Sequence, residues 1–167
     1  MSKNIIYDRE LSNKTYNGIN TILYVEKIVR ERVFDSLYWK QYCFGLNEAT
    51  ILDKAMELQV IGSFETSGRP FPFMCLLVKL IQLAPSIEII QFYLTQDRFK
   101  YLKVLALLYV RIVLKDYEIL KENLNDYRKL RVFINGQYKL SYIDEVVDNL
   151  INDNYFIGLT LTYMDKE

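Results

Sequence analysis

The feature that most constrains the fold is a long apolar segment, residues 97–113, which carries hydrophobic side chains on nearly every face of a helix. Phe99, Leu102, Ala106 and Val113 recur with the spacing of a heptad, and the positions between them are also largely apolar. A surface helix keeps one polar face, whereas a helix that is apolar nearly all round has to be covered by other elements. The chain is therefore expected to pack several helices around this one.

Seven further helices are expected from hydrophobic periodicity and from residues that favour helix ends. They span residues 20–33, 38–42, 47–58, 73–83, 86–94, 116–130 and 141–151. Asn20, Ser86 and Asp116 can each accept a hydrogen bond from the first backbone N–H groups of a helix, and Pro85 ends the helix before it. The expected fold class is mainly α: a single compact multi-helix domain with one small β-hairpin near residues 132–140.

The hairpin is predicted by Asn135–Gly136, which lies between strand-like residues. Asn-Gly favours a two-residue turn because both central residues of that turn adopt positive φ. In this register Phe133 lies opposite Tyr138 and forms an aromatic cross-strand pair. A two-stranded hairpin is marginally stable alone and leaves open edges, so it either packs on helices or is offered to a partner.

The whole chain, residues 1–167, is expected to form one domain. A length of 167 residues with 51% hydrophobic and 25% charged residues is typical of a globular domain, and three prolines and six glycines leave no visible linker. Residues 1–18 are polar and are expected to be an arm that is ordered only where it docks. Residues 152–167 are expected to be an acidic C-terminal end, which is a poor surface for nucleic acid.

The chain contains no histidine, and this excludes much of enzyme chemistry. Without His there is no Cys–His or Ser–His nucleophile, no imidazole zinc ligand and no proton shuttle that titrates near neutral pH. Cys43 and Cys75 match no metal-binding spacing and are expected to be reduced thiols. No apolar run reaches the length of a membrane span. We therefore expect no enzymatic activity, no cofactor, no metal site and no membrane partner.

Asp53 and Glu57 lie four residues apart on one face of a predicted helix. Two carboxylates could in principle serve acid–base chemistry, but no further ligands are spaced for a metal. Like charges at this spacing repel each other, so a nearby cation is expected to compensate. The prediction is a structural ion pair with Arg30, Arg32 or Arg111.

Two basic clusters raise the alternative of direct RNA binding. They consist of Lys27, Arg30 and Arg32, and of Arg128, Lys129 and Arg131. Such clusters can contact phosphates, although solvated faces and internal ion pairs have the same composition. The net charge is zero, with 21 Lys and Arg against 21 Asp and Glu. This balance argues against a protein whose main role is to neutralise a phosphate backbone.

Several stretches of the chain together carry a family resemblance. They are VEKIVRER at 25–32, YWK at 38–40, CFGL at 43–46, DKAMEL at 53–58, PF at 72–73, YVR at 109–111 and NDYRK at 125–129. In this order they resemble the conserved N-terminal domain of the pre-mRNA-splicing factor 38 family, over residues 18–151, without the charged C-terminal tail that many members carry. The resemblance also implies a mainly helical fold with a small hairpin.

The resemblance further implies a nuclear, non-catalytic scaffold of the spliceosome that is associated with the tri-snRNP and required for spliceosome maturation and activation in pre-mRNA splicing. It implies partners that include a zinc-finger splicing protein and a microfibrillar-associated-protein-like splicing factor. The 14 Tyr, nine Phe and one Trp suit protein contacts, because aromatic residues concentrate in interfaces. The residues expected to bind partners are Tyr38, Trp39, Phe133 and Tyr138 as anchors, with Arg128 and Lys129 as charges at the rim.

Overall fold

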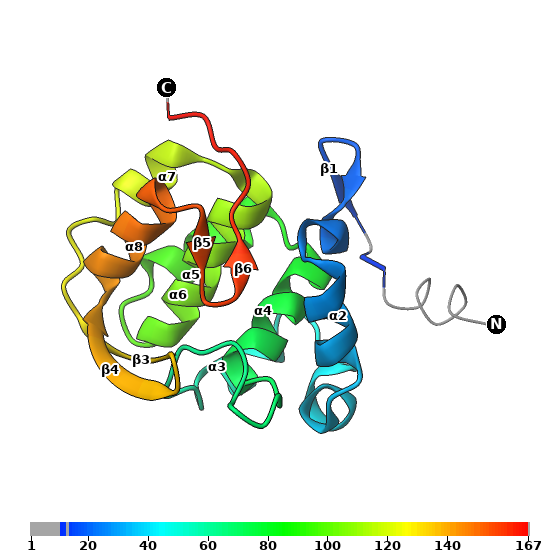
Figure 1. The fold of residues 1–167 in the computed structure, drawn as a ribbon. Helices are drawn as coiled ribbons and strands as arrows, with labels where there is room; N and C mark the ends of the chain where they lie inside the picture. The colour runs from blue at the N-terminus through cyan, green and yellow to red at the C-terminus, as the bar shows by residue number, and fades with distance from the viewer. Residues whose placement is uncertain (1–10, 13, 167) are drawn as a thin grey trace.

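The computed structural model describes residues 11, 12 and 14–166 of the chain. The α-helices are α2 (Lys27–Phe34), α3 (Ile51–Ala55), α4 (Pro72–Leu83), α5 (Ile87–Thr95), α6 (Lys100–Tyr109), α7 (Tyr117–Lys121) and α8 (Ile143–Asn152). A 3-10 helix η1 (Thr21–Tyr24) and two π-helical segments, η2 (Trp39–Cys43) and η3 (Val110–Leu114), join them. Figure 1 shows α4 and α6 in the middle, with α2 on one side and α7 and α8 on the other.

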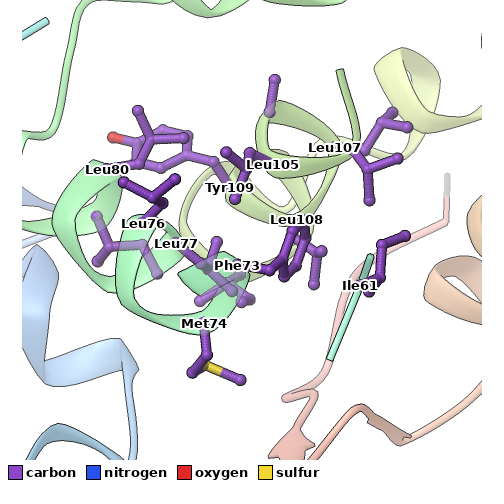
Figure 2. Close-up of a cluster of buried hydrophobic side chains, with 14 of the residues drawn as sticks. Ile61, Phe73, Met74, Leu76, Leu77, Leu80, Leu105, Leu107, Leu108 and Tyr109 are labelled. Carbon is purple, nitrogen blue, oxygen red and sulfur yellow. The ribbon is translucent and has the colours of Figure 1, made fainter. Parts of the chain in front are cut away.

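The centre of the fold is formed by α4 and α6. Every residue from Tyr101 to Tyr109 is buried, and so is every residue from Phe73 to Ile81. Figure 2 shows Leu76 and Leu77 of α4 gathered with Leu108 of α6. The prediction of a covered central helix is confirmed. The helix begins at Lys100, however, and not at residue 97 as expected.

Local hydrogen bonds explain this later start. The Gln96 side-chain oxygen accepts hydrogen bonds from the backbone N–H groups of Arg98 and Phe99, at 3.2 and 2.8 Å. Its amide nitrogen donates to the Phe99 carbonyl at 2.9 Å. Residues 96–99 are therefore held in a turn that competes with the helix.

Two of the predicted helix starts are confirmed in detail. The Ser86 hydroxyl accepts from the Ile89 N–H at 3.4 Å, and the Asp116 carboxylate accepts from the Ile119 N–H at 3.2 Å. The N-terminal segment differs, because Asn20 caps the short η1 and Val25 then adopts an extended conformation. The single helix predicted over 20–33 is therefore two helices. The break changes the helical register, and Ile28 of α2 is exposed.

The segment after α7 is also different from the prediction. The helix expected over 116–130 ends at Lys121, and a strand begins at Lys129. The backbone carbonyls of Asp126 and Arg128 accept hydrogen bonds from the N–H groups of Asp144 and Ile143, at 2.8 and 3.0 Å. These tertiary bonds to the start of α8 hold residues 126–128 in an extended path.

The predicted helix over residues 47–58 is likewise shorter in the structure, because α3 ends at Ala55. Asn47 does cap this region, since its side-chain oxygen accepts from the Ala49 and Thr50 N–H groups at 2.9 Å. Met56 lies beyond the helix and is exposed.

In the part of the chain that the structure describes, three antiparallel hairpins surround the helices, where one was expected. They are β1–β2 (Thr15–Tyr16 with Ile19–Asn20), β3–β4 (Lys129–Ile134 with Gln137–Tyr142) and β5–β6 (Tyr155–Phe156 with Leu159–Thr160). The long hairpin, β3–β4, is the predicted one, and its register pairs Phe133 with Tyr138 as expected. The two short hairpins involve two residues in each strand, too few for an alternating pattern.

Both ends of the described chain contact the body of the molecule. Residues 1–10, 13 and 167 lie outside the described residues, so the structure describes only a minor part of the arm expected over residues 1–18. At the other end, the acidic segment 152–167 places Phe156, Leu161 and Met164 in the core. Buried Arg111 fixes this segment, because it donates to the Leu150 carbonyl at 2.7 Å and to the Thr162 carbonyl at 2.6 Å.

Candidate partner-binding site

The hairpin β3–β4 is attached to the helical body along one edge. The Ile61 N–H donates to the Arg131 carbonyl at 2.8 Å, and the Phe133 N–H donates to the Ile61 carbonyl at 2.8 Å. The Arg131 N–H donates to the Tyr101 hydroxyl at 2.9 Å. The outer edge of β3 is thus occupied by the body.

The turn of the hairpin is held by three aromatic rings. The Phe133 ring lies 5.0 Å from the Tyr138 ring across the strands and 5.0 Å from the Phe71 ring. Asn135 and Gly136 both have positive φ, 54° and 77°. This is the geometry that the Asn-Gly dipeptide favours, because its twist matches that of the strands.

A groove of about 590 Å³ lies on this hairpin, and we call it the hairpin groove. It is lined by Gln59 and by residues 100–101, 129–131 and 138–140. The side chains of Tyr138 and Leu140 are 60% and 61% exposed. Exposed aromatic and aliphatic side chains beside a hollow are typical of a surface that binds another protein.

The hairpin groove is basic. Its lining includes Lys100, Lys129, Arg131 and Lys139, and it includes no carboxylate. The Arg131 guanidinium lies 5.8 Å from the centre of the Tyr138 ring, within cation–π distance. The groove therefore offers positive charge next to apolar surface.

The base of the hairpin is fixed by Asp126. Its carboxylate accepts hydrogen bonds from Lys103 of α6 at 2.8 Å and from Arg128 at 2.7 and 3.0 Å. Arg128 also donates to the Asp97 carbonyl at 2.6 Å. Burial raises the pKa of the Asp126 carboxyl, but the hydrogen bonds from Arg128 and Lys103 outweigh this effect and hold the pKa well below its usual range.

Comparison of the chain with known proteins shows which family it belongs to. The model of the PRP38 family matches residues 14–167. The chain is also 48% identical over 140 residues to Pre-mRNA-splicing factor 38 of Schizosaccharomyces pombe, covering 82% of this chain and 67% of that protein. The chain belongs to the PRP38 family.

Further relatives agree with this assignment. The PRP38 chain is 36% identical over 155 residues to human Pre-mRNA-splicing factor 38A, covering 90% of this chain and 50% of that protein. It therefore spans about two thirds of the length of the fission-yeast relative and half of the human one. A chain in the crystal structure of the Snu23-Prp38-MFAP1 complex of Chaetomium thermophilum matches with a TM-score of 0.83 and 40% identity, covering 89% of this chain and 80% of that chain.

Four of the predicted partner residues lie on or beside the hairpin of this PRP38 chain. Lys129 and Tyr138 line the hairpin groove, and Phe133 packs under the turn. Arg128 lies at the base of the hairpin, where it forms an ion pair with Asp126 at 2.7 Å. Their contact with a partner stays a prediction.

The other two predicted anchors belong to the region of η2. Trp39 is 1% exposed, and its ring packs against Phe34 at 4.8 Å between ring centres. A side chain this buried reaches no partner without local unfolding, so the expectation of Trp39 as a surface anchor is corrected to a core role. Tyr38 is half-buried and contacts the Tyr42 ring at 5.2 Å. Its role as an anchor stays a prediction.

The basic clusters predicted from the sequence are not continuous surfaces. In the first cluster, Arg30 is buried while Lys27 and Arg32 are exposed, and Arg32 lies over the Phe64 ring at 5.5 Å. In the second cluster, Arg128 pairs with Asp126, whereas Lys129 and Arg131 line the basic hairpin groove. The comparisons give no support for direct RNA binding.

Glu57 forms an ion pair with a cation other than the arginines expected. It lies 3.8 Å from Lys54, three residues before it, and the Glu57 side chain is largely exposed. Arg111 donates to main-chain carbonyls at the C-terminal segment. An ion pair of Asp53 with one of the predicted arginines stays a prediction.

Residues that sequence reasoning missed complete the hairpin groove. Gln59, Lys100 and Tyr101 come from segments far from the hairpin in sequence. The bridge at Ile61 holds the segment of Gln59 against β3, and the hydrogen bond from the Arg131 N–H to the Tyr101 hydroxyl holds the start of α6 there. Within the described residues, no group of three or more Cys, Asp or Glu is arranged to hold a metal ion. Over the same part of the chain, no helix has the length and apolar character that crossing a membrane requires.

Proposed function

We propose that this chain is a non-catalytic scaffold of the spliceosome, associated with the tri-snRNP, that promotes spliceosome maturation and activation through protein–protein contacts. The observation that carries the proposal is the match to a chain of the Snu23-Prp38-MFAP1 complex, at a TM-score of 0.83 over 89% of this chain. The two chains also share 40% sequence identity, in keeping with their common fold. The work of such a protein would take place in the nucleus.

The proposed partners are the counterparts of Snu23 and MFAP1 in the same organism. They correspond to the zinc-finger splicing protein and the microfibrillar-associated-protein-like factor implied by the family resemblance. We propose that residues 1–167 act as one domain in these contacts, with one hydrophobic core that extends from Ile22 to Met164 in support of this. A rigid body of this kind can hold several partners at fixed positions.

The proposal is tested by reconstitution with purified proteins. The chain is mixed with the Snu23 counterpart and, separately, with the MFAP1 counterpart, and each mixture is analysed by size-exclusion chromatography with light scattering. We expect a stable complex in each case. Depletion of the protein from a splicing extract is expected to stop splicing after spliceosome assembly, and the purified chain is expected to restore it.

Two results would contradict the proposal. One is the absence of complexes with both counterparts, although the chain is folded by circular dichroism. The other is a depleted extract that splices at the normal rate. A chain that binds the counterparts and a single-stranded RNA oligomer independently would point to an additional RNA-binding role.

A further inference from the structure

The outer edge of β4 carries main-chain groups that meet no hydrogen-bond partner within the described residues. Arg131 and Phe133 direct their backbone groups toward Ile61, away from β4. Hydrogen-bonded and non-bonded pairs alternate along an antiparallel ladder. The residues opposite them, Tyr138 and Leu140, therefore direct their N–H and C=O groups away from β3, at the open edge. Figure 1 shows β4 along the outer border of the molecule.

This edge is only partly protected against pairing with another chain, with Lys139 as its exposed charge. Natural proteins protect an open strand edge with charged side chains, bulges or covering segments, because an exposed edge pairs readily with another chain. Here the two outward-directed positions carry Tyr138 and Leu140, whose side chains are more than half exposed. An apolar edge of this kind is suited to binding an extended peptide.

The charged side chains around the edge favour a peptide of opposite charge. Lys139 lies between Tyr138 and Leu140 in β4 and is exposed. Lys129 and Arg131 lie on the face of the hairpin that Leu140 shares, and Lys100 lies across the hairpin groove. The groove has no carboxylate in its lining, and the Glu145 carboxylate near β4 interacts with the Ser141 hydroxyl at 3.4 Å, beyond Leu140. An acidic segment that pairs with Tyr138 and Leu140 would therefore meet a net attraction.

We propose that an extended acidic segment of a partner protein adds to β4 as a third strand of the hairpin sheet. Its backbone pairs with Tyr138 and Leu140, and its side chains alternate between the two faces. Carboxylates on one face meet Lys139, and those on the other face meet Arg131 and Lys129. The inference rests on the proposed role as a protein-binding scaffold and assigns one of its contact surfaces.

A peptide fits this edge better than RNA does. The open groups are one N–H and one C=O at each of two positions, which is the pattern that another strand satisfies. RNA offers no such ladder. The Tyr138 face is also covered in part by Arg131, which leaves less ring surface for a base to stack on.

The test uses a synthetic ten-residue peptide of alternating glutamate and valine, labelled with fluorescein, and the full chain. Binding is measured by fluorescence anisotropy, and the site is identified by amide chemical shifts and hydrogen exchange of Tyr138 and Leu140. We expect saturable binding and slower exchange at these two amides. A peptide with lysine in place of glutamate is expected to bind at least about tenfold more weakly, because its charge repels the groove.

Two further probes separate strand addition from charge attraction alone. The same acidic peptide with an N-methyl group on every residue keeps its charge but loses the backbone N–H donors of both strand edges, and we expect it not to bind. Equal binding of the methylated peptide would overturn strand addition. So would unchanged exchange at Tyr138 and Leu140, or an oligouridylate that binds more tightly than the acidic peptide.

A matched pair of variants checks the charges. The double variant Lys129→Glu/Lys139→Glu is expected to weaken binding of the acidic peptide by about tenfold or more, since two attractions become repulsions. The control Lys27→Glu/Lys166→Glu changes the net charge equally at exposed positions away from the hairpin groove and is expected to bind as the unaltered chain does. Equal loss in both variants would refute the site.

Failure of strand addition at β4 and failure of the proposed scaffold function would give different results. If the chain forms complexes with the Snu23 and MFAP1 counterparts but does not bind the acidic peptide, the scaffold role stands and the edge of β4 is not the site. If the peptide binds at Tyr138 and Leu140 while both counterparts fail to bind, the edge is a docking site and the proposed partners are wrong.

Discussion

Asp126→Asn tests whether the carboxylate at the base of the hairpin holds the fold together. The Asp126 and Lys103 side chains are each 11% exposed, and Arg128 is 32% exposed. Removal of one partner from a fully buried ion pair costs about 3–5 kcal/mol, because the remaining charge is left uncompensated. Partial exposure of Arg128 lets water compensate in part. We therefore expect a loss of about 2–3 kcal/mol in the free energy of unfolding at pH 7.

The effect of pH gives this prediction a second readout. A carboxyl whose pKa is lower in the folded state contributes stability above its ordinary pKa of about 3.9, and that stability is lost as the pH falls toward the folded value. The pKa of Asp126 is lowered in this way. Each pH unit below about 3.9 removes about 1.4 kcal/mol of the contribution. The difference between the unaltered chain and Asp126→Asn is therefore expected to be about 1 kcal/mol smaller at pH 3 than at pH 7.

The assay is urea unfolding followed by circular dichroism at both pH values. Asp35→Asn is the control, because Asp35 pairs with Lys40 at 3.5 Å on the exposed surface, with side chains that are 89% and 60% exposed. Exposed pairs contribute at most about 1 kcal/mol, so this variant should stay within that range. A cost at Asp126 no larger than at Asp35, or a cost that is the same at pH 3 and pH 7, would refute the assignment.

Three further substitutions probe the core, a helix cap and the hairpin turn, each by urea unfolding. Trp39→Ala is expected to cost about 3–5 kcal/mol, because it removes a large buried side chain; a loss of partner binding without loss of stability would instead make Trp39 a contact residue. Ser86→Ala is expected to cost about 1 kcal/mol through loss of the α5 cap, while Ser67→Ala in an exposed loop should be near neutral; equal costs would show that the cap is not important. Gly136→Ala is expected to cost about 1–2 kcal/mol because φ is +77° there, whereas Gly45→Ala, with open space around its Cα, should cost less; the reverse order would contradict the turn geometry.

Elements with strong local signals could be predicted from the sequence. The ends of α4 and α5 follow from Pro72, Pro85 and Ser86, which limit the backbone wherever they occur. The register of β3–β4 follows from Asn135–Gly136 in the same way. In each case a few adjacent residues determine the conformation, so no knowledge of distant contacts is needed.

Other features depend on distant contacts and could not be predicted. Asn17–Gly18 makes the same turn as Asn135–Gly136, but the strands beside it have two residues each and show no alternation. The Lys103–Asp126 pair joins residues that are 23 positions apart, and no local pattern indicates it. The local sequence therefore indicates the hairpin as the candidate site. It contains no sign that Lys100 and Tyr101 line the hairpin groove.

The exposure of aromatic residues could not be predicted either. Trp39 and Tyr42 lie in the same π-helical segment, yet Trp39 is buried and Tyr42 is exposed. Aromatic side chains are common in both cores and interfaces, so residue type does not decide between them. The packing of η2 against α4 and α2 places Trp39 inside.

The hydrogen bond from the Thr160 N–H to the Glu26 carboxylate, 2.7 Å long, joins residues 134 positions apart. During synthesis the first helices leave the ribosome long before the segment that covers them. The nascent chain therefore displays the apolar surface later covered by Phe156, Leu161 and Met164 until that segment has left the ribosome. Such exposure makes an unfinished chain prone to aggregation, so we expect it to depend on chaperones more than a helical protein of the same size whose contacts are local.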